Sequence, residues 1–86
     1  MTDESTSPSM SQEVLTYLAK SLVDNPDDVS VTPVEEGGET VLELRVHPDD
    51  MGKVIGKRGR TAKAIRTMVK AAATREGAMV AVEIVE

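Results

Sequence analysis

Two glycines flank two basic residues in the run Gly56-Lys57-Arg58-Gly59. A backbone without side chains at the two glycines can approach a phosphodiester closely, while the lysine and the arginine supply positive charge. Phosphate binding by main-chain amides also requires a tight turn and a helix N-terminus directed at the anion, and we expect a helix from about Arg60. The run therefore predicts a phosphate-binding loop. The alternative is an ordinary turn between helices, in which glycines end one helix and begin the next.

The residues on either side of the loop favour phosphate binding over an ordinary turn. The aliphatic pair Val54-Ile55 precedes the loop, and Ala62 and Ile65 follow it at helical spacing. Two glycines in an ordinary turn would not need these aliphatic residues and cations around them. We therefore expect the loop to be an exposed bend between an aliphatic stub and an amphipathic helix.

Other glycine-rich phosphate loops do not fit the spacing. A Walker A loop needs four residues between its glycines and Ser or Thr after its lysine. Three residues separate Gly52 from Gly56, and an arginine follows Lys57. A dinucleotide-binding fingerprint needs the pattern G-x-G-x-x-G after a strand, and no G-x-G occurs in the chain. The sequence indicates neither nucleotide hydrolysis nor NAD binding, and we expect no cofactor.

Charge is segregated along the chain. The net charge is −5, yet the segment from Arg45 to Arg75 holds nine basic residues against two acidic ones, a local net charge of +7. Phosphate attraction depends on charge within a Debye length of about 8 Å, so the local excess matters more than the total. We therefore expect a nucleic-acid partner. Arg60, Lys63 and Arg66 would extend the phosphate track from the loop, unless they form only a solvated helix face.

The remaining reactive side chains do not indicate a metal site or an enzyme. The chain has no cysteine, which excludes disulfides and thiolate metal sites. A single histidine, His47, cannot build a zinc site by itself. Asp49-Asp50 could be read as paired carboxylates for acid–base catalysis. Adjacent residues at a helix start point in different directions, however, and helix capping explains the pair better.

Aromatic side chains are nearly absent. The chain has no Phe or Trp, and its one tyrosine, Tyr17, lies far from the loop in sequence. Stacking of bases on aromatic rings, worth roughly 1–3 kcal/mol per base, is therefore not expected near the loop. We expect one domain to bind weakly and with broad tolerance for sequence, and its affinity to fall as salt rises.

The N-terminal half predicts a tail, a helix and a hairpin. Residues 1–9 are expected to form a disordered acidic tail, and residues 10–86 a single domain. A helix runs from Ser11, with Ser9 or Ser11 as its cap, until Asn25-Pro26 ends it. Two strands follow at 29–34 and 40–46, joined by a turn at Gly37-Gly38. Pro33 suggests that the first strand lies at a sheet edge.

The C-terminal half predicts two helices and a third strand. The run from His47 to Asp50 opens a short helix to about residue 55, whose aspartates suit the positive end of its dipole. A longer helix over about 60–75 ends before Gly77. Its apolar stripe is expected to face the core and consists of Ile65, Met68, Val69 and Ala72. Residues 79–85 close the chain as a strand.

From about Ser11 to its end, the chain resembles a type II KH domain, in which a helix and a strand precede a β-α-α-β unit. Its size, its HPDD-MGKVIGKRGRTAKAIR stretch and the lack of a second domain resemble the KhpA family of bacterial single-KH RNA-binding proteins, described as RNA chaperones. The resemblance implies an α+β, two-layer fold of order α-β-β-α-α-β, with a three-stranded sheet and the helices packed on one face. The acidic tail carries no family motif.

The resemblance also assigns roles to residues. It implies that Gly56, Lys57, Arg58 and Gly59 clamp the sugar–phosphate backbone of a single strand. Aliphatic side chains near the loop would line or support a groove for about four unpaired bases, and these are Val54, Ile55, Ala62 and Ile65. For the first and last of these four, a plain core position is the alternative. The other wall of the groove would come from a strand that the sequence does not identify. The choice of RNA over DNA rests on the resemblance alone.

The resemblance further implies homodimerisation, and heterodimerisation with a larger multidomain KH protein called KhpB or Jag. In that family the pair is linked to RNA fate, cell elongation and envelope synthesis. One alternative is an interaction subunit whose own RNA binding is minor, and another is a ribosome-associated KH protein. We expect a cytoplasmic location without membrane contact, because the chain has no run of 18 apolar residues and no apolar signal segment at its start.

Overall fold

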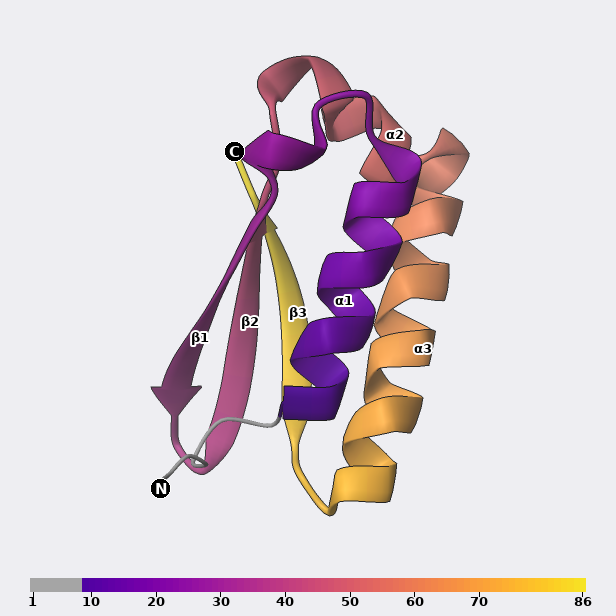
Figure 1. The fold of residues 1–86 in the computed structure, drawn as a ribbon. Coiled ribbons are helices and arrows are strands. Elements are labelled where there is room, and N and C mark those ends of the chain that lie inside the picture. Colours follow the sequence, from indigo (N-terminus) through magenta and orange to yellow (C-terminus); the bar gives the residue numbers. More distant parts are fainter. Residues whose placement is uncertain (1–8) are drawn as a thin grey trace.

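A three-stranded sheet with helices packed against one of its faces makes up the fold (Figure 1). The computed structural model describes residues 9–86. The helices and strands in chain order are α1 (Ser9–Leu22), β1 (Ser30–Glu36), β2 (Glu39–Arg45), α2 (Met51–Ile55), α3 (Arg60–Glu76) and β3 (Val80–Val85). Short 3-10 turns lie at Pro26–Asp28, Pro48–Asp50 and Lys57–Gly59. The expected α+β, two-layer architecture and its element order are confirmed.

The sheet order is β1-β2-β3. A two-residue turn at Gly37-Gly38, with φ of +57° and +84°, joins β1 to β2 as an antiparallel hairpin. β3 pairs with β2 in parallel, an arrangement that requires a crossover connection, and α2 and α3 supply it. β1 is an edge strand, as its proline suggested, and β3 forms the opposite edge.

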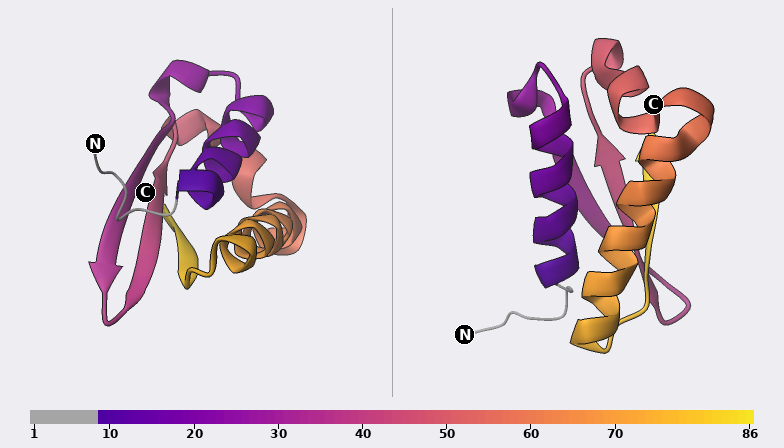
Figure 2. Two further views of the ribbon diagram at one scale, coloured as in Figure 1. Left: turned by 60° about the horizontal axis from the view of Figure 1, so that its bottom comes forward. Right: turned by 90° about the vertical axis from the view of Figure 1, so that its right-hand side faces the viewer.

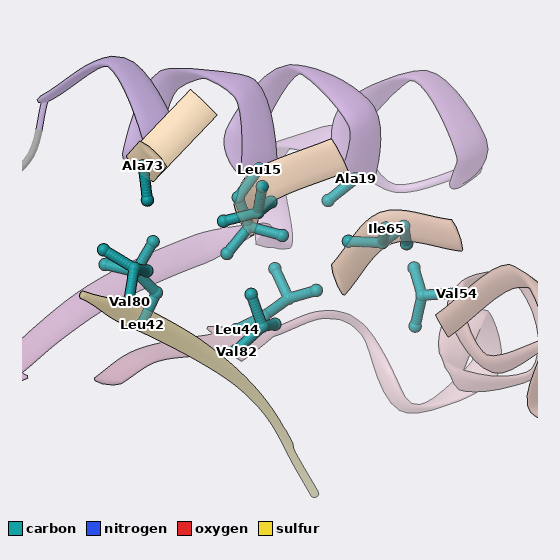
Figure 3. Packing of buried hydrophobic residues seen from close by; sticks show 10 residues of the cluster. Leu15, Ala19, Leu42, Leu44, Val54, Ile65, Ala73, Val80 and Val82 are labelled. Carbon is teal, nitrogen blue, oxygen red and sulfur yellow. The ribbon is translucent and has the colours of Figure 1, made fainter. Parts of the chain in front are cut away.

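The core fills the space between the sheet and the two long helices (Figure 3). All the helices and strands except β1 contribute side chains that are at most 9% exposed. The cluster consists of Leu15, Ala19, Leu42, Leu44, Val54, Ile65, Val69, Ala73, Val80 and Val82. The expectation that Met68 belongs to this core is wrong, because its side chain is 51% exposed. The buried face of α3 centres on Val69, and Met68 is turned about 100° away from it around the helix axis.

α1 begins at Ser9, two residues earlier than expected, and the carboxylate of Glu76 binds its first amides. The N–H of Met10 donates to Glu76 Oε2 at 2.8 Å, and the N–H of Ser11 donates to Oε1 at 3.1 Å. The last residue of α3 therefore accepts hydrogen bonds from the first N–H groups of α1, a role that the sequence predicted for a serine cap. The predicted tail, apart from Ser9, lies outside the described residues. Within 9–86, no helix is both long and apolar enough to cross a membrane.

Candidate nucleic-acid interface

The glycine loop is a tight exposed turn between α2 and α3, at the upper end of the molecule in Figure 1. At Gly56 the chain leaves α2 with φ of +75°, and Gly59 has φ of +72°. Arg58 also has a positive φ, +57°, and it is the one such non-glycine residue in the described chain. The next helix starts directly at Arg60. The turn therefore requires a positive φ at three of its four positions, Gly56, Arg58 and Gly59.

The two glycines meet different surroundings. A Cβ at Gly56 would overlap the side chain of Thr61, lying 2.8 Å from its Cβ. A Cβ at Gly59 would meet nothing within 4 Å. Gly56 is therefore needed so that the loop can pack on the first turn of α3, whereas Gly59 leaves the backbone open to solvent.

The basic side chains around the loop are free to meet a ligand. Lys57, Arg58, Arg60 and Lys63 are exposed, and none of them has an ion-pair partner in the described chain. Arg66 differs, because its Nε donates to the carbonyl oxygen of Val82 at 3.3 Å. The first four form a positive surface over the loop and the start of α3, while Arg66 lies against β3.

The aliphatic residues near the loop lie at two depths. Val54 is fully buried, and Ala62 and Ile65 are 4% and 3% exposed. These three do not reach the surface, and Val54 and Ile65 belong to the hydrophobic core, which was the alternative for them. Ile55 is 37% exposed, so it is the member of this set that a bound molecule could touch.

β3 forms the sheet edge opposite β1, so only one side of its backbone pairs with another strand. The carbonyl of Met79 accepts the N–H of Thr40, so alternate residues of β3 from Met79 onward face β2. The backbone groups of Val80, Val82 and Ile84 therefore point away from β2, and of these the carbonyl of Val82 already accepts the Nε–H of Arg66. Because β2 and β3 are parallel, their C-terminal ends lie at the same end of the sheet. The chain leaves β2 for α2 at this end (Figure 2).

The structure corrects the expected role of Asp49-Asp50. Asp50 makes no cap to its own helix, and its carboxylate is 1% exposed and binds the chain at Asp24 and Asn25 instead. The ring Nδ1 of His47 accepts the N–H of Asp49 at 3.0 Å and caps this turn. Burial raises the pKa of Asp50, but its N–H donors and nearby Lys53 outweigh burial and hold that pKa below its ordinary value.

Metal binding finds no support between residues 9 and 86, where no group of three or more His, Cys, Asp or Glu side chains could hold an ion. The chemistry that the loop offers is cationic and backbone-based. It combines exposed lysine and arginine with a turn that begins a helix, and such surfaces bind anions.

Known proteins are similar to this chain over most of its length. The profile of a family described as KhpA/KhpB, KH domain, matches residues 12–84. A protein named RNA-binding protein KhpA, from Clostridium perfringens, is 58% identical over 74 residues, which cover 86% of this chain and 99% of that protein. Proteins of the same name match from Halalkalibacterium halodurans, at 54% identity over 81% of this chain and 92% of that protein, and from Treponema pallidum, at 44% over 90% and 96%.

The fold also matches a solved structure. A crystal structure of a variant of Aquifex aeolicus Era bound to GDP.AlF4- superimposes with a TM-score of 0.65 at 21% identity. The match covers 96% of this chain and 31% of that one. At this identity the likeness shows a common fold and nothing more.

Proposed function

The chain belongs to the KhpA/KhpB KH-domain family, and on that premise we propose that it binds single-stranded RNA by clamping the sugar–phosphate backbone with residues 56–59. The family membership confirms the resemblance that the sequence suggested. The loop, its exposed cations and the start of α3 support the more specific proposal about the binding site.

The observation that carries the proposal is the conformation of Arg58. A left-handed backbone costs a residue with a side chain roughly 1–2 kcal/mol relative to glycine, yet an arginine occupies this position with φ of +57°. Strain of this kind is typical of functional sites. The preceding Lys57 keeps helical angles, and a right-handed residue followed by a left-handed one directs successive N–H groups into an anion-binding concavity. The N–H of Gly59 already donates to the carbonyl of Gly56 at 3.2 Å, so the N–H groups of Lys57 and Arg58 are those that would meet a phosphate. Side chains and main chain would then meet the same phosphate.

The surface beside the loop would supply the contacts to bases. Ile55 offers an exposed aliphatic surface, and the free edge of β3 offers backbone donors and acceptors such as those of Ile84. The chain has no Phe or Trp, and its one tyrosine, Tyr17, lies on α1. Recognition would therefore depend on backbone contacts and aliphatic packing, which suits weak binding of many sequences.

Weak binding by one domain favours association with a second one, since two linked modules gain effective concentration. We therefore propose that the chain acts as a homodimer, or as a heterodimer with a larger KhpB/Jag-like KH protein. In this role it would be a cytoplasmic RNA chaperone and post-transcriptional regulator, in cell elongation and envelope homeostasis. It would not be an enzyme, because its chemistry is limited to binding.

An interaction subunit with minor RNA binding is a second candidate, and the exposure of Met68 favours it. This large apolar side chain is 51% exposed on α3, flanked by the exposed Ala64 and Ala71. Such a surface suits contact with another protein. RNA binding and protein contact would then use different parts of α3.

The double change Lys57→Asp with Arg58→Asp tests the proposal. We expect it to lower the affinity for a short unpaired RNA oligonucleotide by at least about tenfold, because two favourable charge contacts become repulsive. The measurement is fluorescence anisotropy, with circular dichroism to confirm folding. The matched control is Lys70→Asp with Arg75→Asp, which makes the same charge change in the far half of α3. Equal losses in the two variants would contradict a specific clamp, and unchanged affinity in the loop variant would favour the interaction subunit.

A further inference from the structure

Asp50 is a buried carboxylate that connects α2 to a distant part of the chain. Its Oδ1 accepts the N–H of Asp24 at 3.3 Å, and its Oδ2 accepts the N–H and the Nδ2 of Asn25 at 3.0 and 3.1 Å. A buried charge is tolerated where donors satisfy it, and three donors do so here. The connection between α1 and β1 is therefore held against the start of α2.

α2 depends on such external contacts for its orientation. It has only five residues, far fewer than a helix needs to be stable by itself. Asp50 fixes the residue just before its start, and Val54, which is fully buried, fixes its last turn in the core. Lys53 Nζ lies 3.4 Å from Asp24 Oδ2, but both side chains are well exposed, so this pair contributes little.

The glycine loop leaves α2 at the end opposite Asp50. Its relation to α3 is set by the packing of Gly56 against Thr61. Its relation to the sheet, and so to the free edge of β3, depends on where α2 lies. Without the Asp50 contacts, α2 could pivot about Val54 and carry the loop with it.

We propose that Asp50 is a positioning residue for RNA binding, which holds α2 so that the loop and the free edge of β3 face each other at the correct separation. The inference rests on the proposed function, because it assumes that the loop binds RNA. Asp50 itself does not touch the RNA, since its carboxylate is buried and fully used by Asp24 and Asn25.

The change Asp50→Asn tests this role. It keeps the shape of the side chain but replaces one acceptor oxygen with a donor that faces other donors. We expect the amide NMR signals of Gly56 and Gly59 to move in the RNA-free protein, and the affinity of the folded protein for a short unpaired RNA to fall by about three- to tenfold. The matched control is Asp49→Asn, which makes the same charge change at an adjacent side chain that is 87% exposed. We expect that control to leave both readouts unchanged.

A compensating pair separates positioning from general destabilisation. Combining Asp50→Asn with Asn25→Asp reverses donor and acceptor in the side-chain contact but leaves one of the two backbone N–H groups facing the new amide nitrogen. We therefore expect the loop signals to return part of the way towards those of the wild type and the affinity to recover in part. If Asp50→Asn does not fold, the milder Asn25→Ala removes only the contact at 3.1 Å and should move the same signals less.

Two results would overturn the inference. One is that Asp50→Asn and Asn25→Ala match the Asp49→Asn control in loop signals and affinity. The other is that affinity falls only in proportion to the unfolded fraction, while the loop signals stay in place. The Lys57→Asp, Arg58→Asp variant serves as the reference on the same RNA. If that variant keeps its affinity, the proposed function fails, whereas if it alone loses affinity, only the role of Asp50 fails.

Discussion

A side chain at Gly56 would overlap Thr61, whereas the space around Gly59 is open. Both glycines have positive φ, but only the second lies where an incoming phosphate could use the missing side chain. Between them, Arg58 accepts a left-handed backbone that a glycine would adopt without cost. In this loop, Gly56 is thus required for packing, Gly59 leaves room for a ligand, and Arg58 has a strained backbone.

Substitutions at Arg58 should separate backbone strain from RNA binding. We expect Arg58→Gly to be more stable than Arg58→Ala by about 1 kcal/mol, because only glycine relieves the left-handed strain. Both variants lack the guanidinium, so both should lose RNA affinity to a similar extent. Urea unfolding measures the first difference, and anisotropy with a short RNA measures the second. A glycine variant less stable than the alanine variant would refute the strain, and full affinity in either would refute a phosphate contact by this side chain.

Two carboxylates from other elements hold α1 in place. Glu76, at the end of α3, binds the first amides of α1, and Asp50 binds the connection that follows its last turn. α1 and α3 therefore run side by side in opposite directions (Figure 2). Burial raises the pKa of Glu76, but hydrogen bonds from Met10 and Ser11 outweigh it and leave the pKa below its ordinary value.

These lowered pKa values predict how stability depends on pH. Each carboxyl binds its proton at higher pH in the unfolded chain than in the folded one, so its contribution is present above its ordinary pKa and is lost as pH falls through the lowered folded value. We expect Glu76→Gln to show a shallower loss of stability than the wild type between about pH 5 and pH 2. Urea unfolding across this range measures it, with the exposed Glu13→Gln as control. A wild-type slope in Glu76→Gln would mean that Glu76 does not cap α1.

The whole molecule separates its charges in space. Exposed cations gather on the loop and the first turns of α3, while Glu43 and Glu83 lie next to each other on paired positions of β2 and β3. The sheet face that the helices leave open is therefore acidic, although Arg45 lies 3.4 Å from Glu43. A nucleic acid should approach from the side of the loop, in spite of the net charge of −5.

Salt dependence should report how many of these cations meet phosphates. For single strands, each phosphate neutralised contributes about 0.7 to the slope of log affinity against log salt. We expect Lys63→Ser to reduce that slope by about 0.7, and Arg75→Ser, at the far end of α3, to leave it unchanged. The measurement is RNA affinity over a salt series. An equal change in both variants would mean that general charge, and not a phosphate track beside the loop, governs binding.

Local rules were enough to predict the order of elements, the hairpin and the position of the loop. Gly37-Gly38 predicts a turn because both glycines accept a positive φ, and both have one in the structure. The spacing of apolar residues after the loop predicts the helix that the structure shows as α3. The loop is recognisable from the amino-acid sequence alone, since glycines and cations at adjacent positions need no distant partner to be identified. The family resemblance rested on this stretch together with the size of the chain and the order of its elements.

The tertiary structure decided what depends on residues far apart in sequence. Asp50 binds Asn25, 25 residues away, and Glu76 caps α1 by binding the N–H of Met10, 66 residues away. The exposure of Met68 depends on how α3 packs against α1 and the sheet, and the position of β3 at an edge depends on the strand order. Periodicity describes one element at a time, so partners between elements are fixed only when packing brings them together.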